Sequence, residues 1–191
     1  MARNRKQKPK MKQLIRFGLA PEGKERGAHH ERKHQSRRTE FGARFEEKQK
    51  LKFIYGLSEK ELKRYAREAT RGKGDPKEAL LSLIETRLDN IVHRLGFSPT
   101  RAHARQLVSH GHVWVAGKRL SIPSAHVAIG QEVAVDERTF NNTLVQETLK
   151  NVAILPQWLE RTERKGSLKV LPKREELALP VDLDTVINLL G

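Results

Sequence analysis

Residues 85–112 carry the sequence ETRLDNIVHRLGFSPTRAHARQLVSHGH, in which apolar positions recur at helical spacing. Upstream, Asp75 and Pro76 supply an N-cap and a proline at the first helical position, which predicts one long helix from there to Gly96. Ser98-Pro99 then starts a second helix, and Gly111 ends it. The stretch therefore predicts two helices joined by a tight turn.

The periodicity changes directly after Gly111. Residues 112–115 and 118–120 are predicted as two short strands around a two-residue turn at Ala116-Gly117, although Asn or Asp would suit a position of positive φ better than Ala116. Residues 132–135 form a third predicted strand after Gly130. A small β-sheet is thus expected to follow the helix pair.

Shorter patterns flank these elements on both sides. Ser58 and Glu61 form a capping box, which predicts the start of a helix. The other predicted elements are helices over residues 41–55, 58–72, 141–152 and 182–190, and a hairpin over 158–171 with its turn at Lys165-Gly166.

The composition indicates a protein that binds a polyanion. The 191 residues contain 38 Lys or Arg against 23 Asp or Glu, a net charge of +15, and only 37% are hydrophobic. There is no cysteine, which excludes disulfides, thiolate zinc sites, iron–sulfur clusters and cysteine nucleophiles. No apolar run approaches the roughly 20 residues that cross a bilayer, so we expect no membrane partner.

The first 38 residues hold most of the excess charge. They contain 13 Lys or Arg and 3 acids, a net of +10, and too few apolar residues to bury a core of their own. Residues 30–34 match the zinc-protease pattern H-E-x-x-H, but the many cations around it would repel a metal dication. We interpret this stretch as a basic arm that orders against RNA, with a solvated tail as the alternative.

The two central helices each present a row of polar side chains beside the apolar positions. Arg87 and Arg94 fall two turns apart on the first, and Arg101 and Arg105 one turn apart on the second. Arginine binds phosphate oxygens in pairs, and the backbone amides at the helix start near Thr100 can hold another phosphate. Further polar residues in sequence proximity are Asn90, Ser109, His110, His112, Lys118 and Arg119. The alternative is that these rows are solvated helix faces.

Residues 85–112 closely resemble the RNA-binding module of the bacterial small-subunit ribosomal protein four family. Residues 47–56, EKQKLKFIYG, and 172–181, PKREELALPV, resemble segments of the same family in the same order. The resemblance covers about residues 40–191. It departs at the front, where many relatives place four cysteines that bind zinc and this chain has none, so no cofactor is expected.

The resemblance implies an α+β fold that is mainly α. Its expected parts are a basic extended N-terminal arm (1–39), a helical domain (40–85, completed by 172–191), an inserted RNA-binding module of helix-turn-helix and small β-sheet (86–150), and a hairpin extension (151–171).

The resemblance further implies a non-enzymatic constituent of the small ribosomal subunit. Such a protein binds the 5′ domain of small-subunit ribosomal RNA, nucleates assembly of the subunit body and influences translational accuracy through contact with ribosomal protein five; mRNA where it enters the subunit is a further candidate partner. A cytoplasmic bacterial ribosome is favoured over an organellar one. By motif match, the residues expected to face RNA are Arg87, Arg94, Thr100, Arg101, Arg105, Gln106, His110, Lys118, Arg119 and Ser124.

Two other functions fit the module less well. An RNA-modifying enzyme or tRNA ligase carrying it would need a catalytic domain, and the remaining residues show no phosphate loop or nucleophile motif. A free-standing RNA-binding protein of ribosome recycling or stress would not explain the matching segments outside the module.

Overall fold

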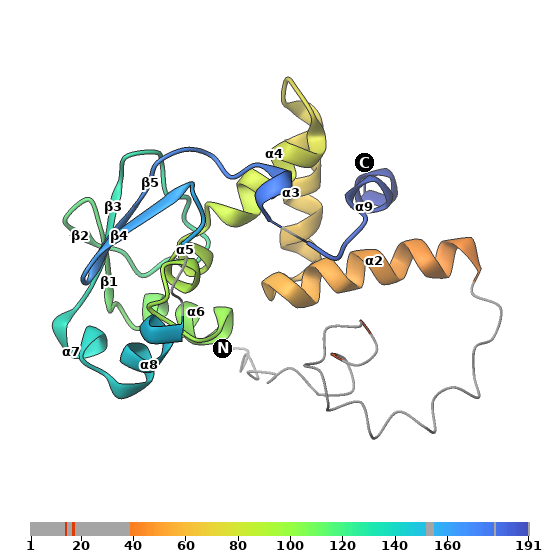
Figure 1. The fold of residues 1–191 in the computed structure, drawn as a ribbon. Coiled ribbons are helices and arrows are strands. Elements are labelled where there is room, and N and C mark those ends of the chain that lie inside the picture. Colours follow the sequence, from red (N-terminus) through yellow and green to blue (C-terminus); the bar gives the residue numbers. More distant parts are fainter. Residues whose placement is uncertain (1–13, 15–16, 18–38, 152–154, 178, 191) are drawn as a thin grey trace, which may run out of the picture.

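The computed structural model describes residues 14, 17, 39–151, 155–177 and 179–190, and confirms an α+β fold that is mainly α (Figure 1). The predictions for the basic arm, including the H-E-x-x-H stretch, lie outside the described residues. Of the arm, Phe17 is described, and its ring lies 5.4 Å from that of Phe53. No helix in the described ranges is long and apolar enough to cross a membrane.

Four helices form the first part of the fold: α2 (Glu40–Tyr55), α3 (Glu59–Arg71), α4 (Pro76–Glu85) and α9 (Leu183–Leu190). The predicted capping box starts α3, and Gly56 ends α2 in the left-handed region with a φ of 62°. The C-terminal α9 returns to pack on α2, α3 and α4 (Figure 1). The two ends of the described chain therefore share one helical layer.

The single helix predicted from residue 75 to residue 96 is wrong. The structure has α4 and a separate α5 (Leu88–Arg94), with Arg87 between them in an extended conformation. The break is made by a distant loop: the amide of Val127 donates to the carbonyl of Thr86 at 2.9 Å, and the amide of Leu88 donates to that of Ala125 at 2.8 Å. These two bonds replace helical ones, so the chain turns where its apolar pattern continues.

The module that follows contains α6 (Arg101–Ser109), packed on α5, and a five-stranded antiparallel sheet. The strands are β1 (Val113–Val115), β2 (Lys118–Arg119), β3 (Glu132–Val135), β4 (Leu159–Thr162) and β5 (Lys165–Leu168), in the order β2-β1-β3-β5-β4. The predicted turn at Ala116-Gly117 is confirmed, with φ angles of 47° and 76°.

The second hairpin was predicted correctly, but its turn was not. The turn lies at Glu163-Arg164, and Gly166 is instead inside β5. A Cβ atom at Gly166 would lie 2.5 Å from Leu95 Cδ2 and 2.8 Å from the carbonyl oxygen of Glu160. This glycine therefore permits close packing of the strand on α5.

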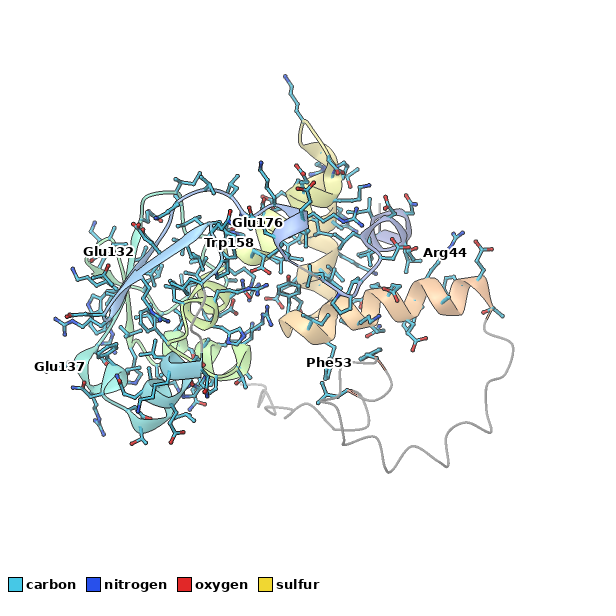
Figure 2. All side chains as sticks on the ribbon, viewed as in Figure 1. Arg44, Phe53, Glu132, Glu137, Trp158 and Glu176 are labelled. Atoms are coloured by element: carbon cyan, nitrogen blue, oxygen red, sulfur yellow. The ribbon has the colours of Figure 1, made fainter. Side chains whose placement is uncertain are left out.

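The helix predicted over 141–152 is present as α8 (Thr143–Asn151), but the short α7 (Glu137–Phe140) and the 3₁₀ turn η2 (Arg174–Glu176) were not predicted. One hydrophobic core runs through both parts of the fold, from Leu51 of α2 to Leu168 of β5. Trp158, labelled in Figure 2, is a completely buried member of this core.

Candidate nucleic-acid interface

Arg87 is buried, which corrects its predicted place on an RNA-facing edge. Its side chain is 1% exposed. Nε donates to Asp89 Oδ1 at 3.0 Å, Nη2 donates to Asp89 Oδ2 at 2.7 Å, and Nη1 donates to the hydroxyl of Tyr65 at 2.9 Å. Burial acts to lower the pKa of this guanidinium, but its bonds to Asp89 outweigh burial and raise it. The paired N–H groups of the guanidinium, which could bind a phosphate, here bind the carboxylate of Asp89 inside the protein.

Glu61 of α3 extends this ion-pair cluster to the surface. Its Oε1 lies 3.2 Å from Arg87 Nη1 and 3.5 Å from Arg105 Nη2. Burial acts to raise the pKa of Glu61, but hydrogen bonds from Ser58 and the two guanidinium charges lower it to about 2. Arg105 also donates to the carbonyl of Gly56 at 3.2 Å, and its side chain is 38% exposed. Arg105 thus joins α6 to the helical part of the fold.

A second cluster surrounds the fully buried carboxylate of Glu85. It accepts from the hydroxyl of Tyr55 at 2.6 Å, from Arg94 Nη2 at 2.5 Å and from the amide of Asn90. Asn90 Oδ1 in turn accepts from Arg101 Nε at 2.7 Å, and the guanidinium of Arg101 lies 4.6 Å from the ring centre of Tyr55. Burial acts to raise the pKa of Glu85, but its bond with Arg94 lowers it, so the carboxylate stays ionised.

These two clusters form what we call the polar seam between the helical part and the module. The four predicted arginines on α5, α6 and their connection all belong to it, and Arg94 is only 24% exposed. Three of them pair with carboxylates there and Arg101 donates to Asn90, so they form no row of unpartnered guanidinium groups. Its members are Tyr55, Glu61, Tyr65, Glu85, Arg87, Asp89, Asn90, Arg94, Arg101 and Arg105.

Three other predicted residues do come together on the surface, where α6 meets β2. His110, Lys118 and Arg119 are exposed, and we call them the basic edge. Arg119 Nε donates to the carbonyl of Gly111 at 2.6 Å, and Arg119 Nη2 donates to that of His110 at 3.1 Å. The Arg119 side chain occupies the space that a Cβ atom at Gly111 would take. In the described part of the chain, neither Lys118 nor Arg119 has an acidic partner.

The remaining predicted residues are spread around the module. Thr100 is exposed and caps α6, its Oγ1 accepting from the amide of His103 at 3.2 Å. Gln106 is half-buried on α6. Ser124 lies in the loop that contacts the start of α5, since the neighbouring Pro123 carbonyl accepts from the amide of Asp89 at 3.1 Å. The structure therefore does not bring Ser124 to the basic edge.

His126, in the same loop, is a candidate that sequence reasoning missed. Its exposed ring lies edge-on to Tyr65, with centroids 5.8 Å apart, and its Nδ1 lies 3.1 Å from Thr86 Oγ1. Burial lowers its pKa, so the imidazole is neutral at physiological pH. Its position beside the break between α4 and α5 could not be inferred, because that break was itself not predicted.

The described residues include no cluster of three His, Asp or Glu side chains that could hold a metal ion. The arrangement described above provides cationic donors and backbone amides at the surface, which are groups that bind phosphate oxygens.

Two family models match this sequence in adjacent segments. A model described as the N-terminal domain of ribosomal protein S4/S9 matches residues 3–85, and the S4 domain matches residues 86–133. The boundary between the matches falls at the break between α4 and α5.

Curated relatives of similar sequence are each named small ribosomal subunit protein uS4. The relative from Methylobacillus flagellatus is 42% identical over 165 residues, which cover 85% of this chain and 80% of the relative. The relative from Natranaerobius thermophilus is 44% identical over 159 residues, with 81% and 76% covered. The relative from Pelobacter propionicus is 42% identical over 158 residues, with 81% and 76% covered.

Proposed function

Because this chain belongs to the uS4 family of small ribosomal subunit proteins, we propose that its basic edge is a contact surface for ribosomal RNA. The chain is a structural, non-enzymatic ribosomal protein that binds ribosomal RNA. The observation that carries the proposal is that Lys118 and Arg119 are exposed without an acidic partner among the described residues. Most other predicted cations are paired inside the polar seam.

The geometry of Arg119 suits this role. Two of its N–H groups are held by the carbonyls of Gly111 and His110, which fixes the plane of the guanidinium. Lys118 precedes Arg119 on β2, which is at the edge of the sheet, and both residues are exposed. A guanidinium held in this way can contact a phosphate with little loss of side-chain freedom, and Lys118 adds a second cation on the same edge strand. Thr100 and Gln106 of α6, and Ser124 of the loop, are proposed as secondary contacts.

The finer parts of the function follow from the family and are proposals. The RNA target is the 5′ domain of small-subunit ribosomal RNA, where binding would nucleate assembly of the subunit body. Contact with ribosomal protein five would influence translational accuracy, and mRNA entering the subunit is a further proposed partner. We place this activity in the cytoplasmic ribosome of a bacterium. We also propose the domain division given by the sequence, with residues 1–39 as a basic arm.

A salt titration tests the basic edge. Binding to a 5′-domain RNA fragment should become less dependent on salt in the double variant Lys118→Gln with Arg119→Gln. The magnitude of the slope of log K against log salt should fall by about 1.4–1.8, because each lost phosphate contact removes about 0.7–0.9. The matched control is Arg138→Gln with Lys150→Gln, which removes the same charge from exposed positions on α7 and α8. An unchanged slope in the first variant, or an equal loss in the control, would contradict the proposed surface.

A second experiment tests the choice of target. The full chain should bind a 5′-domain fragment more tightly than a 3′-domain fragment of equal length at the same salt concentration, since phosphate charge alone cannot distinguish them. Equal affinity for the two fragments would argue against a dedicated 5′-domain site.

A further inference from the structure

The outer face of α3 carries five cations that the module does not use. Lys60, Lys63, Arg64, Arg67 and Arg71 are all exposed, and we call them the basic ridge. They lie opposite the buried residues of α3, since Leu62, Tyr65, Ala66 and Ala69 face the core. A helix rises about 1.5 Å per residue, so the ridge extends along roughly 16 Å of the helix surface.

The acids of the same helix do not neutralise the ridge. Glu59 accepts from Lys48 and Lys52 of α2, each at 2.8 Å, and Glu61 belongs to the polar seam. Hydrogen bonds from Lys48 and Lys52 lower the pKa of Glu59 to about 2, although burial opposes this shift. Both carboxylates are therefore ionised and used on other sides of α3. The third acid of the helix, Glu68, is exposed and forms no ion pair with a ridge cation among the described residues, so the exposed face carries five cations and one acid.

The ridge cations also lack ion-pair partners in the part of the chain that the structure describes. Arg64 lies over the ring of Tyr65, with 4.9 Å between Cζ and the ring centre, and this contact keeps its charge at the surface. Several other cations of the helical part are paired, such as Lys77 with Asp184 at 2.8 Å. Like charges four residues apart, such as Lys60 with Arg64 and Arg67 with Arg71, slightly destabilise a helix. The ridge therefore has the charge of a surface made for a polyanion.

We propose that the basic ridge is a second RNA contact, which lies along the phosphates of one RNA strand and does not read bases. Lys60, Arg64, Arg67 and Arg71 follow one another at intervals of four, three and four residues, or about 4.5–6 Å along the axis. This regular spacing of positive charge fits the regular spacing of phosphates along a strand. The turn after α3, which carries Lys73, projects from the rest of the molecule and extends the ridge (Figures 1 and 2).

The inference rests on the proposed RNA-binding function but concerns a different surface. The module and α3 are linked where the rings of Tyr65 and His126 pack edge-on, beside Arg64, which lies over the Tyr65 ring. The ridge thus lies in the helical part, outside the segment matched by the S4 domain. An RNA that contacts both surfaces would be held at two separated places on one rigid body.

The test is a charge-matched pair of triple variants in the full chain. Lys63→Gln, Arg67→Gln and Arg71→Gln together remove three ridge charges and keep good helix formers. The control replaces Arg138, Lys150 and Arg164 by Gln; these are exposed residues of the module, with no acidic partner among the described residues. Both variants should melt within about 2 °C of the wild type, which shows that the fold is intact.

Binding of each variant to the 5′-domain RNA fragment is then measured from low to high KCl concentration. In the ridge variant, the magnitude of the slope of log K against log salt should fall by about 2–3, and the affinity near 0.15 M salt should fall roughly a hundredfold. The control should lose less than 1. Equal slopes for ridge variant and wild type, or equal losses in the ridge variant and the control, would overturn the inference.

The two proposals fail in different ways. If the ridge variant binds like the wild type while the variant of Lys118 and Arg119 binds more weakly, the ridge is wrong and the basic edge stands. If the wild type itself does not bind the fragment, the proposed 5′-domain target fails first. In a fragment whose duplexed parts have every base pair replaced by another pair, the difference in salt slope between the ridge variant and the wild type should stay the same. A different value would contradict a contact with the RNA backbone alone.

Discussion

Replacing Arg87 by Ala should destabilise the protein without reducing the number of phosphates that it contacts, which is measured as the salt dependence of RNA binding. The side chain is 1% exposed and makes three contacts with acids, two hydrogen bonds to Asp89 and one ion pair with Glu61. Removing it leaves Asp89 as a buried carboxylate with its main partner gone. Breaking a buried pair in this way costs about 3–5 kcal/mol, and in a chain of this size each kcal/mol lowers Tm by roughly 2–4 °C. We therefore expect Tm to fall by roughly 6–20 °C.

The assay combines thermal unfolding with RNA titration at a temperature where the variant is folded. Arg87→Lys should recover part of the stability, since it restores the charge but not the two-pronged contact with Asp89. Lys118→Ala is the opposite control, with near-normal Tm and a reduced salt slope for RNA binding. If Arg87→Ala melted like the wild type yet lost salt slope, the side chain would face RNA and the buried seam would be the wrong description.

Three further predictions concern stability. Burial lowers the pKa of His93 to about 4 in the folded protein, and the pKa of Glu61 is about 2, so the unfolded chain binds protons more readily than the folded one. Tm should therefore fall as the pH is lowered from 6.5 to 2. His93→Asn should make Tm less dependent on pH in the upper part of this range, and Glu61→Gln in the lower part. Ala116→Gly should raise the free energy of unfolding by up to about 1 kcal/mol in urea titrations, because φ is 47° there; a loss would contradict strain at this turn. Gly166→Ala should cost about 1–3 kcal/mol, measured the same way, since its Cβ would collide with Leu95, and near-wild-type stability would show that the strand can shift.

Elements specified by nearby residues were predictable from the sequence. The capping box at Ser58 and Glu61 and the glycine after Tyr55 act within one helical turn, so α2 and α3 begin and end close to the predicted residues. The turn at Ala116-Gly117 was also found from its own two residues. These signals do not depend on the rest of the fold.

Elements made by distant contacts were not predictable in the same way. The loop containing Ala125 and Val127 breaks the helix at Arg87, and no local signal marks that pairing, because Leu88 continues the apolar spacing of α4. Gly166 has the usual appearance of a turn residue, but its role is to admit Leu95. In both places, packing between residues about 40 to 70 positions apart overrides the local pattern.

The same reasoning explains why the burial of Arg87 and the partial burial of Arg94 were not predicted. Helical spacing shows that Arg87 and Arg94 share a side of the chain, but not whether that side meets solvent or acids. Their partners Glu61 and Glu85 come from helices of the other part of the fold. Acids within reach of a predicted cationic row are therefore as informative as the cations themselves.

The polar seam changes how the net charge relates to RNA binding. Arg87, Arg94 and Arg105 each pair with a seam carboxylate, and Arg101 donates to Asn90. We therefore propose that, among the described residues, the charge available to phosphate comes mainly from the basic edge on β2 and the basic ridge on α3. The hydrogen bonds and ion pairs of the seam also fix the orientation of the two parts, because each requires one relative position of donor and acceptor. An apolar interface of the same area would fix the orientation less strictly. Two RNA-binding surfaces held at a constant separation lose little conformational entropy when both engage one folded RNA. Arginines buried between the parts can thus support RNA binding through the geometry they maintain, without touching the RNA.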